Sequence, residues 1–102
     1  MLTALPATRD DVVRALRSFI GPTRARPGCL QCALYEDAED PLHLCLIEEW
    51  DGEEHLQRRL RSKEYRNLLL VLELSTAAPQ ISFDQVSERR GIEVIHAARG
   101  GE

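Results

Sequence analysis

The feature that most constrains the fold is residues 27–62, where two runs of sheet-forming residues lead directly into a helical pattern. The runs, Cys29 to Glu36 and Leu42 to Trp50, flank a short acidic connection that contains Pro41. Alternating apolar residues on both sides of a turn-forming segment predict a β-hairpin. A helix is predicted to begin at Asp51, with this aspartate as its N-cap residue.

Both faces of the predicted hairpin are rich in apolar side chains. On the second strand, Leu44 and Leu46 alternate with Cys45 and Ile47. An antiparallel sheet with one face in water would place polar residues on that face more regularly. We therefore expect both faces to be covered, one by helices of the same chain and the other by a second copy.

Helical patterns precede and follow the hairpin. Residues 8–20 form an amphipathic pattern, which Gly21-Pro22 is expected to end or kink. A third helix is predicted after its N-cap residue, Ser62. Its inward face comprises Tyr65, Leu68, Leu69 and Leu72. Further apolar residues of this helix, Leu70, Val71 and Leu74, point elsewhere. A helix so broadly apolar again favours a homodimer.

Short strands are predicted towards both ends of the chain, at Leu2 to Leu5, Gln80 to Val86 and Ile92 to His96. The last could complete its own sheet or reach into a neighbouring subunit. Residues 97–102 are expected to be a disordered tail. The element order predicts an α+β fold of the ferredoxin-like βαββαβ type, with one antiparallel sheet and a single domain over residues 1–96.

The composition limits the classes of function. A net charge of −4 gives no electrostatic footprint for nucleic acid, and no apolar run approaches the ~20 residues of a membrane span. We expect a cytoplasmic protein whose cysteines, Cys29, Cys32 and Cys45, are reduced. Strand positions three apart point to opposite faces, so Cys29 and Cys32 do not predict a redox pair. No metal-ligand pattern is evident.

These elements together resemble the antibiotic biosynthesis monooxygenase domain over about residues 8–86. The most specific pieces are Pro27-Gly28-Cys29-Leu30, Asp40-Pro41, Glu48-x-Trp50 and Leu60-x-Ser62, in that order. The resemblance implies a dimeric α/β barrel, in which two sheets pack back to back in a homodimer and each subunit has a pocket between sheet and helices. Members of this family include oxygenases of quinols and anthrone-like polyketides that need no cofactor.

At two positions this sequence departs from the family pattern, and these departures bear on the kind of oxygenase that the resemblance implies. Many members carry a histidine where this chain has Arg59, just before the Leu-x-Ser step. Haem-degrading relatives bind iron through a histidine on the third helix, but residues 68–72 contain none. The resemblance therefore implies an oxygenase without haem, metal or other cofactor.

Oxygenation without a cofactor requires that an electron-rich phenol or enol lose a proton, after which its anion donates an electron to O₂. A base with a pKa near neutrality and a fixed cation would suffice. The candidate catalytic residues are His55 as the base and Arg59 as the partner of the anion. The candidate substrate-binding residues are Trp50 and Tyr65 as aromatic walls, with Glu48 orienting one of these groups.

Structural roles for the same residues stay open. Trp50 and Tyr65 could belong to the core, His55 could be solvated, and Arg59 could pair with Glu54 or Glu64. Two functions follow: a monooxygenase acting on a small hydroxylated aromatic, and a non-catalytic small-molecule-binding or stress-response protein. The first predicts that His55 and Arg59 lie inside a cavity, whereas the second predicts that both face solvent.

Overall fold

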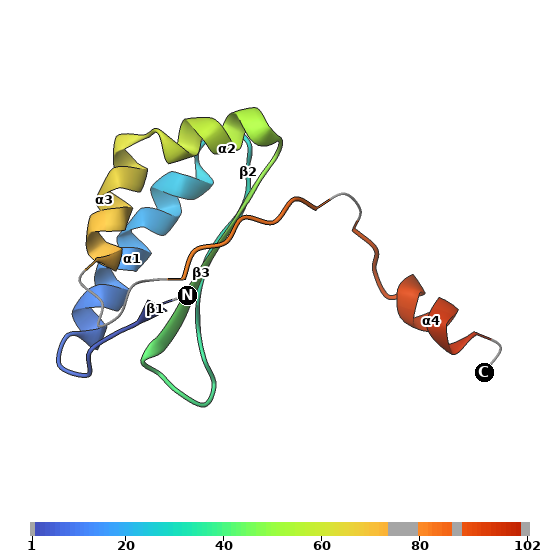
Figure 1. The fold of residues 1–102 in the computed structure, drawn as a ribbon, viewed down its shortest axis with the longest axis horizontal. Helices are drawn as coiled ribbons and strands as arrows, with labels where there is room; N and C mark the ends of the chain where they lie inside the picture. Colours follow the sequence, from blue (N-terminus) through green and yellow to red (C-terminus); the bar gives the residue numbers. More distant parts are fainter. Residues whose placement is uncertain (1, 74–79, 87–88, 101–102) are drawn as a thin grey trace.

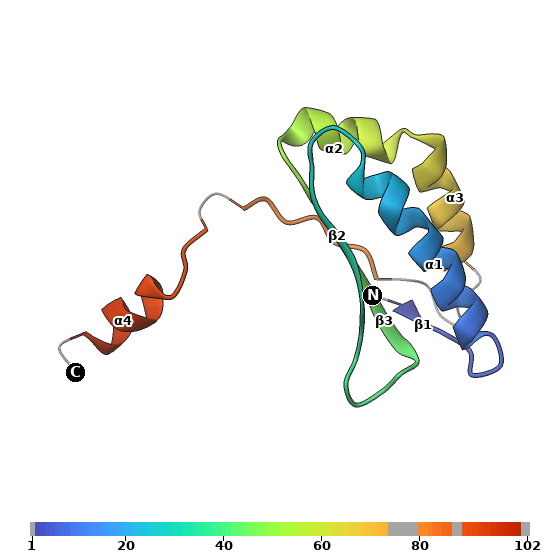
Figure 2. The ribbon, with the colours of Figure 1, turned by 180° about the vertical axis from the view of Figure 1, so that it is seen from behind.

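A computed structural model describes residues 2–73, 80–86 and 89–100. Its elements are β1 (Leu2–Thr3), α1 (Arg9–Arg24), β2 (Cys29–Glu36), β3 (His43–Trp50), α2 (Glu53–Leu60), α3 (Lys63–Leu72) and α4 (Glu93–Arg99). Within these residues, three strands form an antiparallel sheet in the order β1-β3-β2. The helices α1, α2 and α3 lie on the same side of this sheet (Figures 1 and 2). The α+β, ferredoxin-like class predicted from the sequence is confirmed.

The hydrophobic core lies between the sheet and the paired helices α1 and α3. It consists of Leu2, Ala4, Val12, Leu16, Leu44, Leu68 and Leu72. Because Leu44 belongs to this core, the even-numbered residues of β3 face the helices and the odd-numbered ones face away. Glu48 and Trp50 therefore lie on the helix-facing side of the sheet.

The hairpin contains a β-bulge that changes which residues share a face. Cys29 pairs with Trp50 and Cys32 pairs with Glu48, with a shift of register between Cys29 and Gln31. From Cys29 to Cys32 the chain advances three residues along β2, whereas β3 advances only two residues between their partners, Trp50 and Glu48. Both cysteines therefore face the helices. The expectation that they point to opposite faces is wrong, because it assumed a regular strand. Both thiols are free in the structure.

The helix boundaries correct two further expectations. Helix α1 does not end at Gly21-Pro22 but continues to Arg24. Proline removes only its own N–H donor, and the N–H of Ala25 still bonds to the Gly21 carbonyl at 3.2 Å. Helix α2 begins at Glu53 with Gly52 as its N-cap residue. Asp51 is not the cap, because the Gly52 carbonyl accepts the first intrahelical hydrogen bond, from the N–H of Leu56 at 3.3 Å.

The two strands expected near the C-terminus are absent from the described residues. Residues 80–86 have no regular secondary structure, and Glu93 to His96 lie in α4, which extends through Ala97 to Arg99. A strand needs a neighbouring strand to satisfy its backbone. Residues 80–86 cross the hairpin in Figure 1 but pair with none of the described strands. The domain extent, 1–96, stays a prediction, and Leu74 lies outside the described residues.

Ser62 begins α3 as predicted, and its hydroxyl makes two hydrogen bonds. It accepts one from the N–H of Tyr65 at 3.1 Å and donates one to the Arg59 carbonyl at 2.7 Å. Removing an N-cap hydroxyl costs about 1 kcal/mol. We predict that Ser62→Ala lowers the free energy of unfolding by about that amount in urea denaturation.

The matched control for this prediction is Ser18→Ala. Ser18 lies within α1, and its hydroxyl bonds only to the carbonyl of Ala15 in the preceding turn. Such a bond adds little to a helix, so the control should change the stability by less than about 0.5 kcal/mol. Equal effects of the two substitutions would contradict the capping role of Ser62.

Candidate active site

The centre of the candidate site is a buried ion pair between β3 and α2. The Nε and Nη2 atoms of Arg59 each donate to a different carboxylate oxygen of Glu48, both at 3.0 Å. The side chain of Arg59 is 1% exposed and that of Glu48 is 13% exposed. Neither of the expected partners of Arg59 is used, because Glu54 pairs with Arg58 and Glu64 with Arg26.

One nitrogen of this guanidinium group has no partner. Within the described part of the chain, Nη1 of Arg59 is buried without a hydrogen bond. A buried charged donor is costly unless it is hydrogen-bonded. The structure thus holds a cation in a fixed orientation, with hydrogen-bonding capacity left over.

Two aromatic side chains complete this cluster. Nε1 of Trp50 donates to Glu48 at 3.0 Å, so this carboxylate accepts three N–H groups in all. The guanidinium carbon of Arg59 lies 5.2 Å from the centre of the Tyr65 ring, which is a cation–π geometry. The structure therefore brings four of the five predicted site residues together: Glu48, Trp50, Arg59 and Tyr65.

Burial and nearby charges raise the pKa of two weak acids beside this cluster, Tyr65 and Cys32, which keeps both protonated. Burial and the negative charge of Glu48 raise the pKa of the Tyr65 phenol, and Arg59 partly offsets this effect. Burial, Glu48 and Cys29 raise the pKa of Cys32 to about 11. Cys32 lies opposite Glu48 in the hairpin and is buried. This proximity could not be predicted from the residue pattern, because it depends on the bulge.

The fifth predicted residue, His55, lies outside the hydrogen-bonded cluster. It is one helical turn before Arg59 on α2, and its half-buried ring packs against Gly28 in the connection between α1 and β2. Neither imidazole nitrogen forms a hydrogen bond within the described residues. His55 is therefore neither enclosed with Arg59 nor fully solvated.

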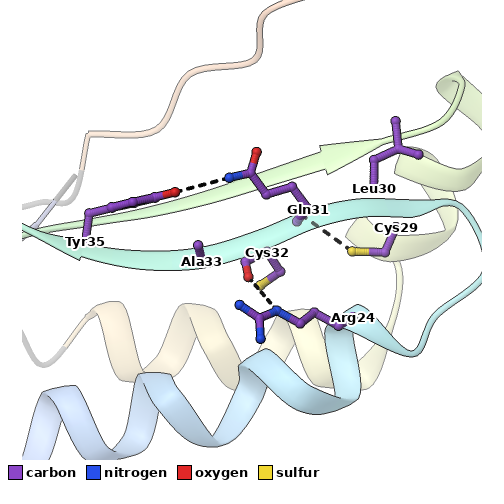
Figure 3. A pocket seen from close by; sticks show the side chains of 7 residues that line it. All are labelled: Arg24, Cys29, Leu30, Gln31, Cys32, Ala33 and Tyr35. Atoms are coloured by element: carbon purple, nitrogen blue, oxygen red, sulfur yellow. Dashed lines mark hydrogen bonds between the residues drawn. The ribbon is translucent and has the colours of Figure 1, made fainter.

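A hollow of about 500 Å³ follows the open edge of β2 (Figure 3). Arg24 of α1 lies on one side of it, with its Nε donating to the Cys32 carbonyl at 2.9 Å. Gln31 and Tyr35 lie on the other side and share a hydrogen bond of 3.1 Å. Of the residues that line this hollow, Cys29 and Cys32 connect it to the cluster, because they pair with Trp50 and Glu48 in the hairpin. The predicted pocket lined by Trp50 and Tyr65 stays a prediction.

Other kinds of site receive no support from the described residues. None of their histidine, cysteine, aspartate and glutamate side chains form a group of three or more that could hold a metal ion. Among the same residues, no helix is both long and apolar enough to cross a membrane.

The chain is similar to one protein family and to several solved structures. A model of the antibiotic biosynthesis monooxygenase family matches residues 1–69. A solved structure described as an antibiotic biosynthesis monooxygenase aligns with a TM-score of 0.72 at 25% identity, covering 83% of this chain and 92% of its own. Rv0793 from Mycobacterium tuberculosis aligns with a TM-score of 0.68 at 29% identity, covering 84% and 92%.

A third similar structure is PA3566 from Pseudomonas aeruginosa, with a TM-score of 0.64 at 30% identity. The alignment covers 72% of this chain and 75% of that one. No curated protein matches the sequence. The similarity therefore concerns the family and the fold.

The buried ion pair predicts a large effect of Glu48→Gln. Removing the carboxylate charge leaves the buried guanidinium of Arg59 without an opposite charge, and such a change typically costs about 3–5 kcal/mol of stability. We predict a loss of that size in the free energy of unfolding. Glu54→Gln, which breaks the exposed pair with Arg58, should cost less than about 1 kcal/mol. A loss below about 1 kcal/mol for Glu48→Gln would contradict the burial of the pair.

The raised pKa of Cys32 predicts a loss of stability at high pH. The unfolded chain releases this thiol proton near its ordinary pKa of 9.0, and the folded protein only near 11. The stabilisation is therefore complete below pH 9 and is lost as the pH rises towards 11. Cys32→Ala should make the free energy of unfolding fall less steeply across this interval in urea titrations. An unchanged slope would contradict the assignment.

Proposed function

Because the chain belongs to the antibiotic biosynthesis monooxygenase family, we propose that it is a cofactor-independent monooxygenase that oxidises a small hydroxylated aromatic, such as a quinol or polyketide-like compound, with O₂. The observation that most supports this reaction is the unpartnered Nη1 of the buried Arg59. A phenolate or enolate oxygen is the kind of ligand that such a nitrogen lacks.

The geometry of Arg59 suits the stabilisation of an aromatic anion. Glu48 occupies the Nε and Nη2 donors, which fixes the plane of the guanidinium. A donor that is already oriented needs no reorganisation when negative charge develops on the substrate. The electrostatic attraction is also stronger in a site from which water is excluded. Arg59 would thereby favour the ionised form of a bound phenol.

The reaction balances without a cofactor when O₂ is the oxidant. A base removes the phenolic proton, and the phenolate transfers one electron to O₂, giving an aromatic radical and superoxide. These combine at a ring carbon to form a peroxide anion, which takes the proton back from the base and becomes a hydroperoxide. Loss of water from the hydroperoxide leaves the quinone, so one oxygen atom enters the ring and the other becomes water. The protein supplies only a base, a fixed cation and a dry aromatic wall.

Each candidate residue has a role in this scheme. His55 is the proposed base, because its ring nitrogens form no hydrogen bond in the described residues and imidazole is the side chain that most often serves as a general base. Trp50 and Tyr65 are the proposed aromatic walls. The phenol of Tyr65, kept neutral by its raised pKa, can also donate a hydrogen bond to the substrate anion. Glu48 orients both Arg59 and Trp50.

The alternative of a non-catalytic binding protein predicts that His55 and Arg59 face solvent. Arg59, at 1% exposure, does not fit that alternative. His55, which is half-buried, fits neither hypothesis fully. Measurement of oxygen uptake separates the two functions.

We also propose that the protein is a homodimer that packs through the sheet face turned away from the helices. That face presents Ile47 and Tyr35, which are 41% and 47% exposed in the single chain. Helices α1, α2 and α3 lie on the opposite face (Figure 2). A second copy would bury these apolar side chains, as the two-sided hairpin predicts.

The proposed reaction predicts oxygen uptake with quinols or anthrones without added flavin, haem or metal. Loss of a general base typically costs 10²- to 10⁴-fold in rate, so His55→Ala should lower kcat by at least about 10²-fold. His43→Ala, which removes the exposed histidine beside Asp37, is the control and should leave the rate unchanged. Uptake no faster than without protein, across the whole panel, would contradict the proposal for these substrates.

The role of Arg59 is tested by Arg59→Lys rather than by removal of the charge, since Glu48 needs a cation. Lysine lacks the planar fork and cannot present a second fixed donor. We predict that kcat falls about 10²-fold, as for loss of one donor to an oxyanion. Arg58→Lys, on the exposed side of the same helix, should have no effect. Full activity of Arg59→Lys would refute the anion-binding role.

The dimer predicts a sedimentation coefficient for twice the mass of the chain at micromolar concentration. Ile47→Glu should shift the equilibrium to monomer, because it places a charge in the proposed interface. The control is Leu5→Glu, at a residue of similar exposure, 44% against 41% for Ile47, between β1 and α1. A stable monomer of the unmodified protein at this concentration would refute the dimer.

A further inference from the structure

We propose that Gly28 is a positioning residue, which sets the orientation of the His55 imidazole by allowing it to lie directly on the backbone. The inference rests on the proposed role of His55 as the base. The two residues are far apart in sequence, and Gly28 lies outside the helix that carries His55. The contact is thus a feature of the fold rather than of local sequence.

The structure leaves no room for a side chain at position 28. A Cβ atom built on Gly28 would lie 2.6 Å from both Cβ and Cδ2 of His55 and would also collide with Cγ. Carbon atoms in contact normally lie about 3.5–4.0 Å apart. The imidazole therefore occupies the space that any other residue at this position would fill.

The conformation of Gly28 and its hydrogen bond fix this contact. Its φ angle is 83°, in the region that favours glycine. Its carbonyl accepts the N–H of Asp51 at 2.7 Å, which ties the loop to the segment that leads into α2. The ring of His55 is thus held between the loop and its own helix. Its orientation comes from packing, because neither ring nitrogen is hydrogen-bonded in the described residues.

This arrangement suits a base that exchanges a proton with a bound substrate. Many catalytic histidines are oriented by a carboxylate on one nitrogen, which also raises the proton affinity of the other. Here, packing against Gly28 orients the ring and leaves both nitrogens available. A side chain at position 28 would turn the ring and misplace the proton acceptor, and small misplacements of reacting groups are costly.

The chain contains a matched control for the test. Gly52 has a φ angle of 85°, almost equal to that of Gly28, but a Cβ atom there would meet nothing within 4 Å. Gly28→Ala and Gly52→Ala therefore both place an alanine at a positive φ angle, which strains the backbone. Only Gly28→Ala adds a collision with His55.

The first measurement is an NMR pH titration of the His55 ring protons in the unmodified protein and in both variants, assigned with His55→Gln. Gly28→Ala should shift the His55 resonances and change their titration midpoint, whereas Gly52→Ala should leave them in place. Equal shifts in the two variants would overturn the proposal. In the unmodified protein, the Gly28 Hα protons should show strong nuclear Overhauser effects to the ring. Their absence would also overturn it, even if Gly28→Ala does not fold.

The second measurement is the pH dependence of oxygen uptake. Gly28→Ala should lower kcat at least tenfold and move the acid limb of the pH profile, with KM changed less than twofold. Gly52→Ala should keep kcat within twofold. Should the unmodified protein consume no oxygen, the proposed function fails, while the NMR comparison still decides whether Gly28 positions His55.

Discussion

The structure depends on one carboxylate that accepts three N–H groups. Glu48 lies on β3, the central strand of the described sheet, and binds Arg59 of α2 and Trp50 of its own strand. Through the cation–π contact, Arg59 also reaches Tyr65 of α3. A buried ion pair rarely stabilises a fold more than apolar residues of the same volume would. Its presence in so small a core is consistent with the proposed role of Arg59 as a fixed cation.

Local features of the sequence predicted the hairpin, the cap of α3 and the inward position of Leu68 and Leu72 in the core. The bounds of β2 agree with the prediction, and Ser62 makes the expected hydrogen bond to Tyr65. The partner of Arg59 could not be found in this way. Glu54 and Glu64 are its neighbours in sequence, but Glu48 reaches it only when α2 folds back on the sheet. Pairing across elements depends on topology, which local patterns do not encode.

The errors have the same physical origin. The faces of Cys29 and Cys32 were misjudged because a bulge, not visible in the residue pattern, changes the alternation. Residues 80–86 have the composition of a strand, but strand propensity is realised only beside a partner strand. Gly28 was identified as part of a family motif, whereas its contact with His55 depends on helix α2 meeting the connection between α1 and β2. Sequence patterns thus predicted local elements better than the contacts between those elements.

The central claim is that the free nitrogen of Arg59 binds an aromatic anion. The most direct test is the absorption spectrum of nitrophenol, which reports its ionisation and is not consumed by oxygen, in titrations with the protein. The account predicts that bound nitrophenol is ionised at a pH where the free compound is mostly neutral, and that Arg59→Lys abolishes this shift. Binding as the neutral phenol, or no binding at all, would contradict it.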